Sequence, residues 1–175
     1  DAGVPMIEAI GLALVTGTVC GLINGIILVK FPELSSMIVT LATQIIFRGI
    51  AQIILETNSV GGFPSWFTQI AAGKIDELVP YALIFVIFEA LFFAYLLHYT
   101  KFGRRCYAMG NSTTVAKFSG VKTGKIKVIV YTMTGLLSAV AAIYLASKMS
   151  SVRPDVAKGY ELDIIAMAVL GGVST

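Results

Sequence analysis

Four long stretches of the chain consist almost entirely of apolar residues. They span residues 9–29, 35–55, 78–99 and 126–146, and a fifth stretch begins near residue 164. A helix needs about 20 predominantly apolar residues to cross the hydrocarbon core of a bilayer. The pattern therefore predicts an all-α fold, a polytopic bundle of four full transmembrane helices with the start of a fifth.

The composition agrees with a membrane protein. Of the 175 residues, 57% are hydrophobic and 13% are charged, and the mean hydropathy is +0.85. Soluble domains carry about 25% charged residues, and a chain of this length has too little interior to hide so much apolar surface from water. We therefore expect residues 1–175 to form a single transmembrane domain in a lipid bilayer. A soluble enzyme, a disordered tail and a nucleic-acid-binding module are excluded.

The connections between the apolar stretches differ in charge, and this difference predicts the topology. Residues 100–125 contain six Lys and Arg residues and no acid. An excess of Lys and Arg marks the cytoplasmic side of a membrane. We expect this loop and residues 30–34 in the cytoplasm, and residues 56–77 and 147–163, which include Glu161, on the outer side. A patch for nucleic acid or anionic lipid is a second interpretation of the basic loop.

Small residues recur at intervals of four along the first stretch, at Ala9, Ala13, Gly17, Gly21 and Gly25. Small residues at this spacing let helix backbones approach each other closely, which favours helix packing in lipid. The fourth stretch returns to small residues, at Gly135, Ser138, Ala139, Ala142 and Ala146. We expect both helices to pack closely against neighbours.

Polar side chains follow one face of the second stretch, at Thr40, Gln44 and Arg48. Residues four apart are separated by about 400° around a helix, so these three share one sector. A charge deep in lipid is costly, so this face must meet a partner helix or water. A translocation path and a structural ion pair both explain it, and we hypothesise that Arg48 pairs with Glu89. We assign the face to a candidate substrate path, together with Asn24, because a buried amide in lipid needs a partner.

Within residues 100–125 the sequence predicts a short helix that lies parallel to the membrane. Gly110 permits a turn, and the polar residues 111–113 can cap a helix start. Gly120 suits the C-terminal end of this helix. Phe118 on the helix needs cover, which either a cytosolic partner or packing back onto the bundle would provide.

The other reactive side chains do not form a catalytic or metal-binding set. Cys20 lies in an apolar stretch and Cys106 in the basic loop, so they do not make a disulfide framework. The single histidine, His98, cannot supply a metal cluster, and Glu89 lies near the opposite face of the same helix. The sequence has no phosphate-binding Gly-x-x-x-x-Gly-Lys-Ser/Thr motif. We therefore predict no catalytic residues, no metal and no cofactor.

Short motifs follow one another in order along nearly the whole chain. They are Gly21-Leu-Ile-Asn-Gly25, Ile38-Val-Thr-Leu-Ala42, Phe47-Arg-Gly-Ile-Ala51, Thr100-Lys-Phe-Gly-Arg104, Tyr107-Ala-Met-Gly110, Phe118-Ser-Gly-Val121, Gly159-Tyr-Glu-Leu-Asp-Ile-Ile-Ala166 and Val169-Leu-Gly-Gly-Val-Ser174. Each motif is weak alone. Together they resemble the membrane permease subunit of bacterial ABC-type monosaccharide importers, the ribose, galactose, rhamnose and autoinducer-2 class. By this fold-level analogy the chain is a fragment of a permease of roughly ten helices.

The resemblance also implies partners and a coupling site. The partners are a second permease subunit in a homo- or heterodimer, a cytosolic ATP-binding subunit that hydrolyses the ATP, and an extracytoplasmic sugar-binding protein. The loop 100–125 would couple the permease to the ATPase in the bacterial inner membrane, through Gly103, Arg104, Gly110, Asn111, Ser112, Thr113, Ala116, Phe118, Ser119 and Gly120. A branched-chain amino-acid permease and a structural membrane subunit without transport activity are the alternatives.

Overall fold

Four long helices dominate the computed structural model, which describes residues 5–56, 58–75 and 79–172. The helices are α1 (Met6–Lys30), α2 (Ser36–Leu55), α4 (Tyr81–Tyr99) and α7 (Thr123–Met149). Each is long and apolar enough to cross a membrane. The four predicted spans are therefore confirmed as helices, with ends that differ from the expected ones by a few residues.

Shorter elements connect the long helices. They are α3 (Ser65–Ala72), α5 (Lys101–Asn111), α6 (Thr113–Phe118), α8 (Tyr160–Leu170) and the two-residue strands β1 (Val60–Gly61), β2 (Lys74–Ile75), β3 (Val79–Pro80) and β4 (Ser151–Val152). β1 pairs antiparallel with β4, with Val60 opposite Val152, and β2 pairs with β3. The pattern of apolar stretches did not reveal α3 or α5, because neither contains a long apolar run.

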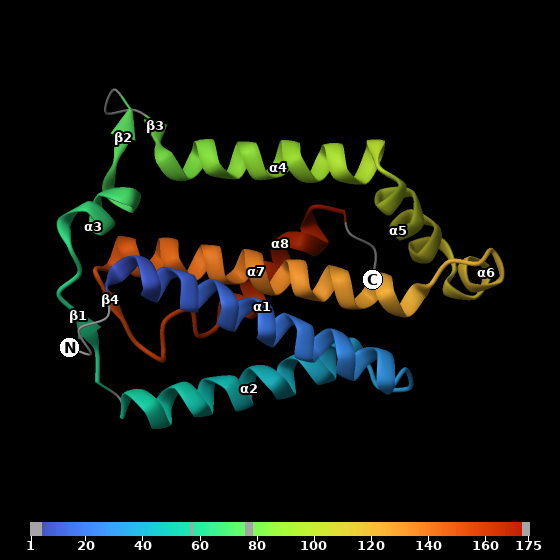
Figure 1. The fold of residues 1–175 in the computed structure, drawn as a ribbon, viewed down its shortest axis with the longest axis horizontal. Helices are drawn as coiled ribbons and strands as arrows, with labels where there is room; N and C mark the ends of the chain where they lie inside the picture. Colours follow the sequence, from blue (N-terminus) through green and yellow to red (C-terminus); the bar gives the residue numbers. More distant parts are fainter. Residues whose placement is uncertain (1–4, 57, 76–78, 173–175) are drawn as a thin grey trace.

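The centre of the fold is the close contact between α1 and α7, which lie side by side in Figure 1. A Cβ atom added to Gly25 would lie 2.9 Å from the Cα of Val128, and one added to Gly17 would lie 2.9 Å from the carbonyl oxygen of Gly135. A Cβ atom on Gly21 would collide with the carbonyl oxygen of Tyr131. The predicted packing of small residues is therefore confirmed for these two helices.

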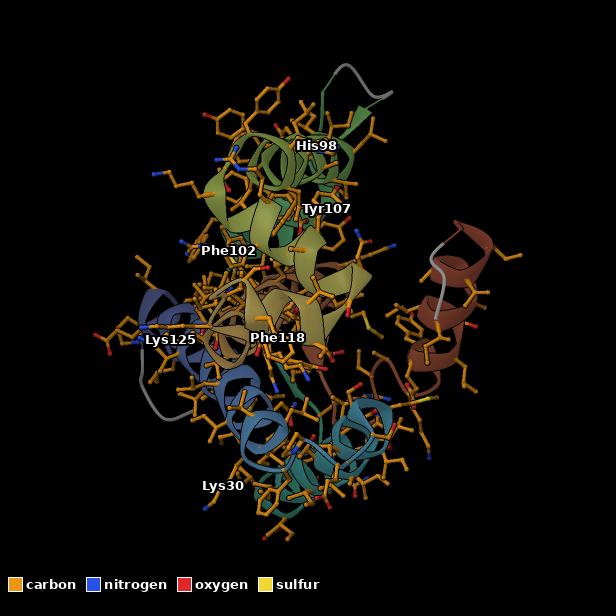
Figure 2. The ribbon with its side chains drawn as sticks, turned by 90° about the vertical axis from the view of Figure 1, so that its right-hand side faces the viewer. Lys30, His98, Phe102, Tyr107, Phe118 and Lys125 are labelled. Atoms are coloured by element: carbon orange, nitrogen blue, oxygen red, sulfur yellow. The ribbon has the colours of Figure 1, made fainter. Side chains whose placement is uncertain are left out.

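α2 and α4 lie on opposite sides of the α1–α7 pair, as Figures 1 and 2 both show. The predicted ion pair between Arg48 on α2 and Glu89 on α4 is therefore not formed in the described chain.

The helices carry many exposed apolar side chains, such as Ile45 at 73% and Phe88 at 68%. Such surfaces suit lipid or further helices, as expected for a multi-pass membrane protein.

The connections gather at two ends of the bundle. The turn between α1 and α2 lies at the same end as α5 and α6, while α3 and the β1–β4 pair lie at the opposite end (Figure 1). This arrangement agrees with the expected alternation of the connections.

At the end of the bundle that holds α3, Phe67 is buried, and its carbonyl oxygen accepts a 2.6 Å hydrogen bond from Ser147 Oγ of α7.

Candidate functional site

The segment of residues 100–125, which we call the coupling segment, begins with a sharp turn out of α4. The Thr100 side chain caps α5, because its Oγ1 accepts a 3.2 Å hydrogen bond from the Gly103 backbone N–H. Gly103 is buried against the backbone of Leu97, where a Cβ atom would not fit. Gly110 lies inside α5 rather than at a turn, so the expected break falls later, at Ser112.

The predicted short helix is α6, and its ends lie where the sequence placed them. Ser112 Oγ accepts a 3.3 Å hydrogen bond from the Val115 backbone N–H, which caps the helix start. Gly120 follows the helix with a φ of +77°, a left-handed conformation that favours glycine. Ala116 is 2% exposed, so it holds α6 against the rest of the chain.

Phe118 projects away from the bundle. Its side chain is 89% exposed and that of Val115 is 64% exposed, so α6 does not fold back to cover them in the described structure. Three basic residues of α5 and α6, Arg104, Arg105 and Lys117, are exposed as well. Figure 2 looks onto this end of the molecule, where Phe118 and Lys125 are labelled. The exposed side chains of α5 and α6 thus include both an aromatic residue and basic residues.

The polar face of α2 forms the second part of the candidate site. Gln44 and Arg48 are half-buried. Thr40 is half-buried too, but its hydroxyl donates to carbonyl oxygens of its own helix, at 2.9 Å to Ser36 and 3.1 Å to Met37. The hydroxyl of Thr40 is therefore already engaged, and Gln44 and Arg48 carry most of the polarity of this face.

Glu161, in the first turn of α8, lies against this polar face. Its carboxylate lies within electrostatic range of the Gln44 and Arg48 side chains. Glu161 Oε2 also accepts a 3.0 Å hydrogen bond from the Gly159 backbone N–H. We expected Glu161 in the connection before the fifth stretch, but it lies in the first turn of α8, because the helix begins at Tyr160. The only signal in the sequence was a carboxylate three residues before the apolar run that begins at Ile164.

The other predicted residues lie apart from this cluster. The Asn24 Oδ1 atom is buried and has no hydrogen-bond partner among the described residues. Glu89 faces a cavity of about 1260 Å³ between α3, α4 and α7, whose walls also include Trp66, Phe85 and Tyr144. The structure therefore places Glu161 near Gln44 and Arg48, whereas Asn24 and Glu89 have other surroundings.

Residues 2–175 match the protein family described as "Branched-chain amino acid transport system / permease component". Because this match covers nearly the whole chain, the chain belongs to that family of membrane permeases. The family assignment agrees with the four candidate membrane helices.

Curated relatives are similar over most of the chain. The chain is 37% identical over 152 residues to the ribose import permease protein RbsC of Bacillus subtilis, which covers 86% of this chain and 47% of RbsC. It is 35% identical over 179 residues to the autoinducer 2 import system permease protein LsrD of Salmonella typhimurium, which covers 98% of this chain and 53% of LsrD. The chain thus spans about half the length of the curated relatives it matches. No solved structure matches it.

Proposed function

We propose that the chain is part of the transmembrane permease subunit of an ATP-driven ABC importer. Its cargo would be a monosaccharide or a similar small sugar signal, carried across the bacterial inner membrane. The observation that carries this proposal is α6, a short capped helix whose Phe118 side chain is 89% exposed. The import permeases for ribose and autoinducer 2 named above support the choice of substrate class.

In this proposal α6 docks onto a cytosolic ATP-binding subunit. The coupling segment carries basic residues and no acid, which favours a cytoplasmic position. The α3 end of the bundle would then face outward, toward an extracytoplasmic sugar-binding protein. A second permease subunit, identical or related, would complete the transporter.

The packing of α1 and α7 suggests how a movement of α6 is transmitted to the proposed substrate path. α6 is joined to the start of α7 through Gly120, and α7 is held tightly against α1 by the glycine contacts. Closely packed helices move as rigid bodies. A push on α6 would therefore shift α1 and α7 together relative to α2. We place Asn24, Thr40, Gln44 and Arg48 along the path, because hydrogen-bonding groups suit a sugar.

An amino-acid permease is the second candidate. The description of the family names branched-chain amino acids, and the opposite charges of Arg48 and Glu161 could hold the two charged groups of an amino acid. The import permeases named above, for ribose and autoinducer 2, favour the sugar. Uptake of ribose and of leucine by the complete transporter separates the two candidates.

Affinity purification of the full-length permease tests the proposal. We expect an ATP-binding subunit to co-purify, and Phe118→Asp to abolish its retention. Phe31→Asp is the matched control, because Phe31 is an exposed phenylalanine at the same end of the bundle but outside the coupling segment. Ala116→Arg is unsuitable, since Ala116 is buried and the change would disturb α6 itself.

Two results would contradict the proposal. If no ATPase accompanies a membrane-inserted, intact protein, the importer assignment fails and a structural membrane subunit becomes the better interpretation. If both phenylalanine variants retain the ATPase as well as the unchanged protein does, α6 is not the coupling site.

A further inference from the structure

An open pocket of about 670 Å³ lies where the end of α1 meets the start of α7, at the end of the bundle that holds α5 and α6 (Figure 1). Its apolar wall consists of Val29, Val121, Val128 and Ile129. Lys122 and Lys125 line the same pocket. Gly124 lies between the two lysines, and a Cβ atom there would come within 3.1 Å of Val29 Cγ1. The pocket therefore combines an apolar wall with two cationic side chains.

The positive charge of this pocket is not balanced by an acid within it. Lys122 and Lys125 are both exposed, and among the described residues no Asp or Glu lines the pocket. The connections at this end, residues 31–35 and 100–122, contain a single acid, Glu33. No side chain caps the start of α7, so the partial positive charge of its first turn adds to that of the lysines. The pocket therefore favours an anion.

The length of α7 places this pocket at the edge of the bilayer. The helix has 27 residues, and at 1.5 Å per residue it is about 40 Å long. This length matches the thickness of a bilayer together with its headgroups, about 40–45 Å. The first turn of α7, with Lys125, therefore lies among the headgroups. Val128 and Ile129 lie about one turn further along the helix, where the hydrocarbon core begins.

A ligand for this pocket must be anionic at one end and apolar at the other. We propose that the pocket binds an anionic phospholipid, whose phosphate contacts Lys122 and Lys125 and whose acyl chain lies along Val128 and Ile129. Basic pockets between membrane helices bind anionic headgroups in this way on the cytoplasmic side. A free phosphate ion would leave the apolar wall unused. This lipid site goes beyond the proposed transport function and does not depend on the cargo.

Native mass spectrometry of the full-length permease tests the headgroup preference. Phosphatidylglycerol and phosphatidylcholine with identical acyl chains are the probes, and we expect the protein to retain phosphatidylglycerol preferentially. The double variant Lys122→Gln, Lys125→Gln should weaken this binding by about fivefold for each lysine removed. Lys101→Gln with Lys117→Gln is the matched control, because it removes the same charge from exposed positions outside the pocket at the same end. Excess inorganic phosphate should not displace the lipid.

Photo-crosslinking in the native membrane tests the position of the lipid and leaves both lysines in place. The photoreactive residue p-benzoylphenylalanine replaces Ile129, whose side chain is 45% exposed in the pocket wall. We expect its adducts to be phospholipids enriched in anionic headgroups relative to the membrane as a whole. Ile87 is the matched control position, because it is 51% exposed on α4, a helix without Lys or Arg. Adducts at Ile87 should follow the lipid composition of the membrane.

Four results would overturn the lipid site. Equal retention of the two phospholipids would remove the role of charge, and equal weakening by both lysine pairs would show diffuse attraction instead of a pocket. Displacement by inorganic phosphate would make the pocket a site for free phosphate. Adducts of the residue at position 129 with protein would show that another segment or subunit covers the pocket. None of these results affects the proposed function, which is tested separately by co-purification of the ATPase.

Discussion

Ser147 connects two distant parts of the chain with one hydroxyl group. It is 1% exposed near the end of α7, donates to the carbonyl oxygen of Phe67 at 2.6 Å and accepts from the backbone N–H of Ala71 at 3.1 Å. Both partners belong to α3, which is only eight residues long. A helix of that length is not stable in isolation, so this side chain holds α3 in place.

We expect Ser147→Ala to lower stability by about 1–3 kcal/mol, because it removes the two hydrogen bonds that tie α3 to α7. Ser138→Ala on the same helix is the control, since Ser138 is exposed. Thermal unfolding of the purified protein in detergent measures both variants. Equal melting temperatures for the two would show that the hydroxyl of Ser147 does not hold α3.

At the level of elements, α1 and α7 form the rigid part of the structure. Gly17 and Gly21 on α1 meet the small residues Gly135 and Ala139 on α7, and Gly25 packs against the backbone of Val128. Ser138 and Ala142 of the predicted set are exposed instead. Spacing alone identified the helices that pack closely, but the choice of partner depends on how the connections fold.

Gly21→Leu should separate α1 from α7, because even a Cβ atom at this position would collide with the carbonyl oxygen of Tyr131. Overpacking of this kind costs about 1–3 kcal/mol. Gly11→Leu on the same helix has no heavy atom within 4 Å to meet and should be tolerated. The yield of protease-resistant protein after solubilisation compares the variants, and a tolerated Gly21→Leu would refute tight packing of this pair.

For the whole molecule, the two ends of the bundle differ in charge and in structure. The α5–α6 end carries the basic coupling segment, and the opposite end carries α3 and the paired strands β1 and β4. α8 makes no extensive contact with another described helix, and Leu170 near its end is 87% exposed. Curated relatives about twice as long as this chain have further residues to cover such surfaces.

Labelling of intact cells checks the orientation of the two ends. In a background with both native cysteines replaced by serine, we expect Ser59→Cys to react with a membrane-impermeant maleimide added outside. Ser119→Cys on the coupling segment should react only after the cells are opened, because an excess of basic residues favours the cytoplasmic side. Both serines are exposed, so burial does not decide the result. The reverse labelling pattern would show that the predicted topology is inverted.

The sequence by itself determined the elements that depend on local chemistry. The length of the apolar stretches is enough to identify α1, α2, α4 and α7, because a helix of about 20 apolar residues is what crosses the hydrocarbon core. The polar residues 111–113 and Gly120 were enough to locate the two ends of α6, because caps act within one turn of the backbone. The small residues of α1 were enough to predict close packing.

Only the tertiary structure decided which distant side chains meet. Arg48 was expected beside Glu89, the nearest available acid in the middle of a stretch, but α1 and α7 lie between their helices. Glu161 lies within electrostatic range of Arg48 instead, because the turns after β4 bring the start of α8 toward α2. Such a return depends on packing against residues more than a hundred positions away, which no local pattern encodes.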